Sequence, residues 1–152
     1  MTDTRGEGVL HHNFMEWGNW AGSLRGRSRG VLVADRLGKA VGFGLFGLQE
    51  RSTLFVKPGE EVYGGMIVGE NARSDDMDVN VSKEKKLTNM RTTSSDENIK
   101  LEPPRQITLE LALEFIQDDE LIGVTPAAIR LRKRVLDPSQ RKKAAKKANQ
   151  PA

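Results

Sequence analysis

Between residues 30 and 70, short apolar runs alternate with turn residues, and this pattern constrains the fold more than any other feature of the chain. The first two runs flank the turn RLGK, so they predict a β-hairpin with Leu37, Gly38 and Lys39 near its tip. A Lys-Pro-Gly turn at 57–59 separates the last two runs. Several short strands at this spacing are typical of a small antiparallel barrel or a curled sheet. The four expected strands are GVLVAD at 30–35, AVGFGLFGL at 40–48, TLFV at 53–56 and YGGMIVGE at 63–70.

A helix is predicted after a long stretch without periodicity. Residues 71–100 show no helical or strand period, and thirty such residues are uncommon in a compact domain unless they are functional or disordered. Thr108 then has the side chain of a helix N-cap and precedes apolar residues at helical spacing. The expected amphipathic helix spans about 108–118 and covers one face of the sheet. Its apolar face consists of Leu109, Ala112, Leu113 and Ile116.

Two runs near the C-terminus, ELIGV at 120–124 and IRLRKRVL at 129–136, flank the turn TPAA and predict a closing hairpin. In the second run apolar residues alternate with Arg130, Arg132 and Arg134, so a strand would place these arginines on one face. A helix with Pro126 in its first turn is the alternative. The predicted class is therefore α+β, with a small antiparallel, barrel-like sheet and one amphipathic helix.

The net charge of +3 is unevenly distributed. Residues 130–147 hold nine Lys and Arg against Asp137 alone, a charge of +8, which leaves 3 − 8 = −5 for the rest. A basic end on an acidic body favours a polyanionic partner, usually nucleic acid. A solubilising tail explains the same charge equally well. Residues 138–152 have no apolar stripe, so we expect a disordered tail that becomes helical only on binding.

Several patterns that resemble catalytic or binding motifs fail in their context. GFGLFG at 42–47 matches the dinucleotide-binding pattern, but its glycines lie inside an expected strand rather than between a strand and a helix. DDMDVN at 75–80 lacks the later glycine and glutamate of a calcium loop. Asp118, Asp119 and Glu120 follow the helix and are expected to form a solvated turn rather than an acid–base pair. We therefore predict no enzymatic activity for this chain, and no catalytic, cofactor-binding or metal-binding residue.

The absence of cysteine removes disulfides and thiolate metal sites, and it fits a reducing compartment. No window approaches the ~18 apolar residues that cross a bilayer, and the N-terminus has no apolar signal. These features predict a cytoplasmic protein. Residues 16–29 mix glycines and arginines without a helical or strand periodicity, so we interpret them as a connector. Trp17 and Trp20 are expected to anchor this connector onto the body.

Four segments of the chain are informative together: VYGGMIVGENARSDDMDVNV, KKLTNMR, SDE and LEPPRQITLELALEFIQDDELIGVTPAAIRLRKR. In this order they resemble the C-terminal domain of the TypA/BipA family of bacterial translational GTPases. The resemblance covers about Arg5 to Arg141, and TRGEG at 4–8 looks like the last strand of a ferredoxin-like domain similar to domain V of elongation factor G. It implies a remnant strand at 1–15, the connector at 16–29, the C-terminal domain at 30–137 and the tail at 138–152. GTP and magnesium would belong to the family's GTPase domain, which this chain lacks.

The resemblance implies that a monomer binds the ribosome during large-subunit assembly and stress-responsive translation, without a membrane. In the family, the loop that matches 83–96 lies against the A-loop of the large-subunit rRNA and the acceptor end of A-site tRNA. The alternative is a truncated, non-functional product, or a protein-interaction domain with a solubilising tail.

The chemistry of this loop suits RNA. Its cations match phosphates, and its hydroxyl and amide groups match 2′-hydroxyls and base edges. Leu87 and Met90 either face an unstacked base or hold the loop against its own barrel. The candidate RNA-binding residues are Lys83, Lys85, Lys86, Leu87, Thr88, Asn89, Met90, Arg91, Thr92 and Ser94 in the loop, with Arg130, Arg132 and Arg134 on the last strand.

Overall fold

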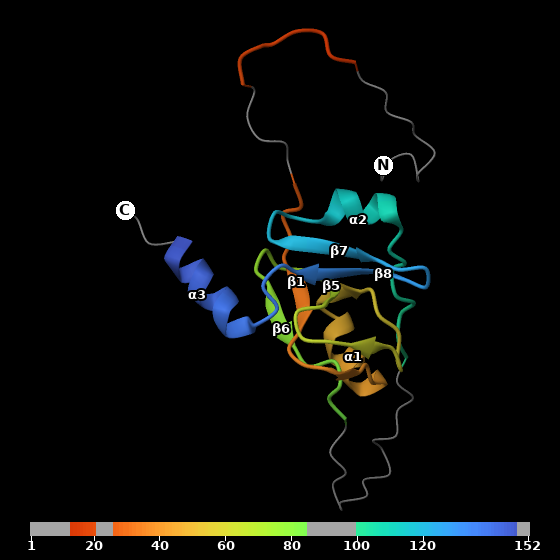
Figure 1. Ribbon diagram of the computed structural model, residues 1–152. Helices are drawn as coiled ribbons and strands as arrows, with labels where there is room; N and C mark the ends of the chain where they lie inside the picture. Colours follow the sequence, from red (N-terminus) through yellow and green to blue (C-terminus); the bar gives the residue numbers. More distant parts are fainter. Residues whose placement is uncertain (1–12, 21–25, 85–99, 149–152) are drawn as a thin grey trace, which may run out of the picture.

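A four-stranded mixed sheet forms the centre of the fold in the computed structural model, which describes residues 13–20, 26–84 and 100–148 (Figure 1). The strand order is β3-β5-β1-β6. β1 pairs with β5 in antiparallel and with β6 in parallel orientation, and β3 pairs antiparallel with β5. The bounds are β1 Val31–Ala34, β3 Ser52–Leu54, β5 Ile67–Asn71 and β6 Met77–Val79.

This sheet separates two hydrophobic cores. Along β1, Leu32 and Ala34 belong to one core, whereas Val31 and Val33 belong to the other. A strand that is covered on both faces needs a continuous apolar run, and VLVA supplies one. The first core is closed by helix α1, Gly42–Gln49.

The second core lies under α2 and the hairpin of β7 and β8 (Figure 1). Ala112 and Phe115 of α2 and Leu131 of β8 are buried against this face of the sheet. The rings of Phe55 and Phe115 meet edge to face, with centroids 5.4 Å apart. The bounds are α2 Leu109–Phe115, β7 Glu120–Val124 and β8 Ile129–Lys133.

The remaining elements lie at the edges of this arrangement. β2, Gly38–Lys39, pairs with β4, Glu61–Val62, in a separate two-stranded sheet. Helix α3, Pro138–Ala148, projects away from the sheets (Figure 1).

The structure confirms the α+β class, the closing hairpin and the N-cap of α2. β7 and β8 pair antiparallel, so the helical alternative for the last run is wrong. The Thr108 hydroxyl accepts a hydrogen bond from the backbone N–H of Leu111 at 3.3 Å. The strands lie in three sheets that do not close into a barrel, and three helices are present in the described residues instead of the one expected.

The prediction of a strand at 40–48 is wrong, because this run forms α1. Its buried residues, Gly44, Leu45 and Leu48, recur at helical spacing and cover the first core. A Cβ on Gly44 would lie 2.5 Å from the carbonyl oxygen of Val81, so a glycine is required for this close approach. Consequently β1 pairs with β5, and Gly38 and Lys39 of the predicted turn form β2, which pairs with β4.

The prediction that 71–100 lacks secondary structure is also wrong, because Met77–Val79 forms β6. Asp76, just before β6, accepts a hydrogen bond from the backbone N–H of Val31 at 2.9 Å and so helps to align the strand with β1. Residues 85–99 lie outside the described part of the chain, as does the expected remnant strand up to residue 12.

Two expectations about helices need correction. The apolar face of α2 is narrower than predicted, since Leu109 and Leu113 are exposed. The tail was predicted to be disordered, but its described residues, 138–148, form α3. Asp137 caps this helix by accepting a hydrogen bond from the backbone N–H of Ser139 at 2.7 Å, and Pro138 suits the first helical position.

Candidate nucleic-acid interface

Two of the three arginines of the last run share one face of β8, as the alternation predicted. Arg130 and Arg132 lie on the face of β8 opposite Leu131 and Lys133, which are buried. Arg134 follows directly after the strand and is exposed. The Arg130 Nε atom is buried and has no hydrogen-bond partner among the described residues.

The candidate loop is described only at its start. Lys83 is exposed and follows the last buried residue of this segment, Val81, by two positions. The other loop candidates lie outside the described residues, so the structure neither groups them nor separates them. They are Lys85, Lys86, Leu87, Thr88, Asn89, Met90, Arg91, Thr92 and Ser94.

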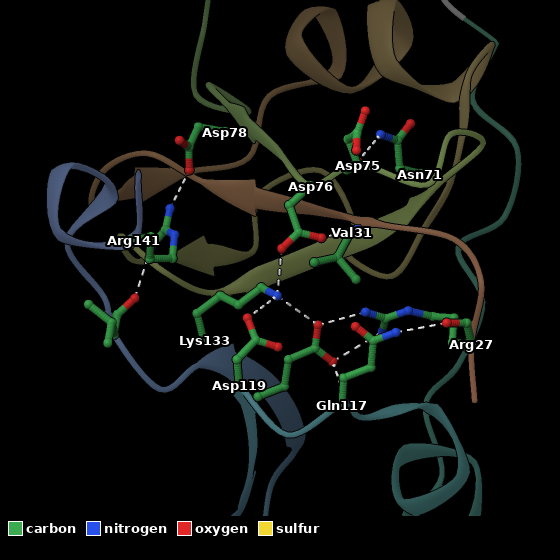
Figure 2. A network of polar contacts seen from close by, with 12 residues as sticks. Arg27, Val31, Asn71, Asp75, Asp76, Asp78, Gln117, Asp119, Lys133 and Arg141 are labelled. Atoms are coloured by element: carbon green, nitrogen blue, oxygen red, sulfur yellow. Dashed lines mark hydrogen bonds and ion pairs between the residues drawn. The ribbon is translucent and has the colours of Figure 1, made fainter. Parts of the chain in front are cut away.

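Lys133 differs from its arginine neighbours, because its side chain points into the protein and is 2% exposed. Its ammonium group contacts three carboxylates: Asp76 at 2.6 Å, Asp119 at 2.8 Å and Glu120 at 3.0 Å (Figure 2). A buried ammonium ion loses its hydration, so it needs such a set of acceptors to remain charged. This lysine therefore belongs to the interior rather than to the basic surface.

Glu120 joins Lys133 to the N-terminal connector. Its two carboxylate oxygens accept hydrogen bonds from both terminal nitrogens of Arg27, at 2.7 and 3.1 Å. The same guanidinium group lies 4.2 Å from the centre of the Phe115 ring and donates to the Phe115 carbonyl oxygen at 3.1 Å. The expectation of a solvated turn at 118–120 is thus wrong for Glu120, which is a buried partner of two cations.

Arg27 also anchors the connector, residues 16–29, to the body of the protein. Trp17 and Trp20, which were expected to serve this purpose, are 92% and 85% exposed. Gln117 strengthens the anchor, since its side-chain amide donates to the Arg27 carbonyl oxygen at 2.7 Å (Figure 2).

The charge state of Lys133 follows from two opposed influences. Burial alone would lower its pKa, but hydrogen bonds to Asp119, Asp76 and Glu120 outweigh burial and raise the pKa above the ordinary value of 10.5. The side chain is therefore a firmly charged member of an ion cluster that consists of Arg27, Asp76, Asp119, Glu120 and Lys133. We call it the buried ion cluster after its buried centre of Arg27, Glu120 and Lys133, whereas Asp76 and Asp119 lie at its solvent-exposed edge.

An open groove of about 770 Å³ runs beside this cluster. Aspartates of the body line it together with residues of α3. Asp78 of β6 forms ion pairs across it, with Arg141 and with Lys142, whose Nζ lies 3.5 Å from the Asp78 carboxylate. The aspartates of the groove are Asp75, Asp76, Asp78, Asp118 and Asp119, and its α3 residues are Arg141, Lys142 and Ala144.

Within the described ranges, no three His, Cys, Asp or Glu side chains form a group suited to a metal ion. None of the helices in the same ranges has the length and apolar character needed to cross a membrane.

Comparison with known proteins decides the family. A sequence model of the TypA/BipA C-terminal domain matches residues 29–138. The chain belongs to the TypA/BipA family. Curated TypA/BipA relatives share this sequence over 95% of the chain: the large ribosomal subunit assembly factors BipA of Escherichia coli K12 at 50% identity, of Bacillus subtilis at 47% and of Haemophilus influenzae at 47%. The chain spans 24% of the length of each of these relatives.

The buried ion cluster was missed by the interpretation of the sequence, although a signal for it existed. The turn between the two strands pairs Val124 with Ile129, and this register places Glu120 opposite Lys133. Lys133 also shares its side of β8 with the buried Leu131. The hairpin pattern therefore predicts that Lys133 points inward and faces the inward carboxylate of Glu120. Arg27 and Asp76 had no such signal, because their contacts join segments far apart in sequence.

Proposed function

We propose that this chain is the module with which a TypA/BipA-type assembly factor binds the large ribosomal subunit, and that it acts through RNA contacts rather than catalysis. The observation that carries the proposal is the separation of cations on β8 in a member of this family. The charge of Lys133 is compensated inside the protein, whereas Arg130 and Arg132 lie on the opposite face of β8 and Arg134 is exposed just after the strand. These three arginines can contact phosphates. The relatives are named large ribosomal subunit assembly factors, which supports binding to the large subunit.

The loop at 83–96 is the part of the module that we expect to contact RNA bases as well as phosphates. It would lie against the A-loop of the large-subunit rRNA and the acceptor end of A-site tRNA, as the family resemblance implies. Its lysines and Arg91 would contact phosphates, its small polar residues 2′-hydroxyls, and Leu87 and Met90 unstacked bases. The module would act in the cytoplasm as a monomer, and GTP and magnesium would not bind to it.

Co-sedimentation with purified large ribosomal subunits tests this function. Binding by the unaltered chain should weaken steeply between about 50 and 200 mM salt, because each phosphate contact releases counterions. The double substitution Lys85→Glu with Arg91→Glu should abolish pelleting, since it reverses two cations in the proposed contact.

The matched control is Arg51→Glu with Lys57→Glu, which changes the net charge equally at two exposed positions outside the loop. This control should lose only the small affinity expected from net charge. Unchanged pelleting of the loop variant would refute the loop assignment. If the unaltered chain does not pellet even at low salt, the alternative of a protein-interaction domain with a solubilising tail is favoured.

A further inference from the structure

Helix α3 is attached to the body mainly by charge. Among its residues with described side chains, Pro138 and Arg141 are partly buried and the others are exposed. Arg141 donates to the backbone carbonyl oxygens of Val135 and Leu136, at 3.1 and 2.7 Å, and forms its ion pair with Asp78 (Figure 2). A helix without an apolar contact face gains little from packing, so the ion pairs determine where it rests.

The two sides of this attachment differ in rigidity. Asp78 lies within β6, opposite Val33 of β1, so the central sheet fixes its position. On the other side, Lys142 is 74% exposed, whereas Arg141 is 15% exposed and Asp78 is 25% exposed. The groove beside both ion pairs is open to solvent. The exposed Lys142 pair is weak in water, and the open groove gives another anion access to Arg141, so this anion can replace the carboxylate.

We propose that α3 is a second RNA-binding element, and that the Asp78 carboxylate occupies its cations in the free protein until RNA phosphates replace it. This inference rests on the proposed function and extends it to a surface outside the loop. A phosphate offers a guanidinium group the same kind of oxygen acceptors as a carboxylate does, so Arg141 can exchange one for the other. Arg141, Lys142 and the exposed Lys143 would then lie along the RNA backbone.

RNA is a better partner for this helix than an anionic membrane. A helix that lies in a membrane surface needs an apolar face opposite its cations. The sequence PSQRKKAAKKA supplies no large apolar residue for such a face. The groove side of α3 meets aspartates, so its cations already face acceptor oxygens.

The first test compares two aspartates of the same groove. Asp78→Asn should tighten binding to large subunits and to a short single-stranded RNA about threefold, because the competing carboxylate is lost. Asp118→Asn removes an equal charge from the groove at an exposed residue that has no ion pair with α3 among the described contacts, so it reports the general electrostatic gain. A Kd for Asp78→Asn that equals or exceeds that of the Asp118→Asn control would overturn the proposal.

The second test observes α3 itself and does not depend on ribosomes. The chain has no cysteine, so Ala144→Cys provides a unique site for a nitroxide label beside the groove. The short RNA should mobilise the label in the otherwise unaltered chain, and Asp78→Asn should mobilise it without RNA. An unaltered spectrum in Asp78→Asn, or release by anionic phosphatidylglycerol vesicles but not by RNA, would refute the proposal.

The two tests also separate this inference from the function on which it rests. If RNA releases α3 through Asp78 but the chain does not pellet with large subunits, the ribosomal function fails and the exchange at Asp78 stands. If large subunits bind in a loop-dependent manner while Asp78→Asn changes neither affinity nor label mobility, the ribosomal function stands and the exchange fails.

Discussion

Two aspartates at the same end of the central sheet bind cations from the basic C-terminal segment with opposite consequences. Asp76, just before β6, pairs with Lys133, whose side chain is buried. Asp78, two residues later within β6, pairs with Arg141 and Lys142 at the edge of an open groove. The residue types are nearly the same, and Asp76 is more exposed than Asp78. The burial of the cation, rather than its charge, therefore divides this segment into a structural part and an exchangeable part.

The physical basis of the difference is desolvation. Lys133 and Glu120 have lost contact with water, so removing one partner would leave the other as an uncompensated buried charge. Around Asp78, water can solvate each partner when the ion pair opens, and the pair adds little to the stability of the fold. The next experiments set these two regions against each other.

Lys133→Met should have the largest effect on stability. It removes the cation shared by three carboxylates and leaves Glu120 buried with Arg27 as its remaining cationic partner. We expect the free energy of unfolding to fall by about 3 to 5 kcal/mol, the range for breaking a buried ion pair by removal of one partner. Urea denaturation followed by circular dichroism measures it.

Lys143→Met is the matched control, because it removes the same charge from an exposed position on α3. Its unfolding midpoint should match that of the unaltered chain. Equal losses of stability in the two variants would show that burial does not separate the two regions.

The hairpin shows how far the sequence can predict such a difference. Its strands, its turn and the side occupied by the arginines were predictable from alternation, and the register that joins Glu120 to Lys133 follows from the turn. Alternation also suggests that residues 129–135 place only apolar groups inside, and Lys133 breaks that pattern. A buried cation of this kind can be predicted from sequence only when the two facing strands are considered together.

Helix α1 shows where prediction from sequence fails. Its run of glycines and apolar residues suits a strand or a buried helix, and no polar residue before Gln49 marks its period. A contact with a residue far away in the sequence decides between strand and helix, because Gly44 must lie close to the Val81 carbonyl oxygen. Asp78 poses the same difficulty, because its partners on α3 lie 63 residues or more along the chain.

Alkaline pH should weaken the buried region by a smaller amount than Lys133→Met does. The pKa of Lys133 is raised above 10.5 in the folded protein, so the folded state holds this proton more tightly than the unfolded state. Its contribution is therefore complete below about pH 10.5 and is lost as the pH rises through the folded pKa. Urea midpoints measured from pH 9 to 12 should fall more for the unaltered chain than for Lys133→Met, whereas parallel curves would contradict the assignment.

The smallest effect is expected at the Asp78–Arg141 pair beside the open groove. In a double-mutant cycle of Asp78→Asn and Arg141→Gln, the coupling to global unfolding should be below about 1 kcal/mol, because both partners regain water when the pair opens. High salt should remove most of this coupling, since screening acts strongly on charges near solvent. Urea denaturation of the four proteins at low and high salt measures both quantities. A coupling of about 3 kcal/mol that persists in high salt would place Asp78 with the buried ion cluster, and a carboxylate held so firmly would not yield its cations to phosphate.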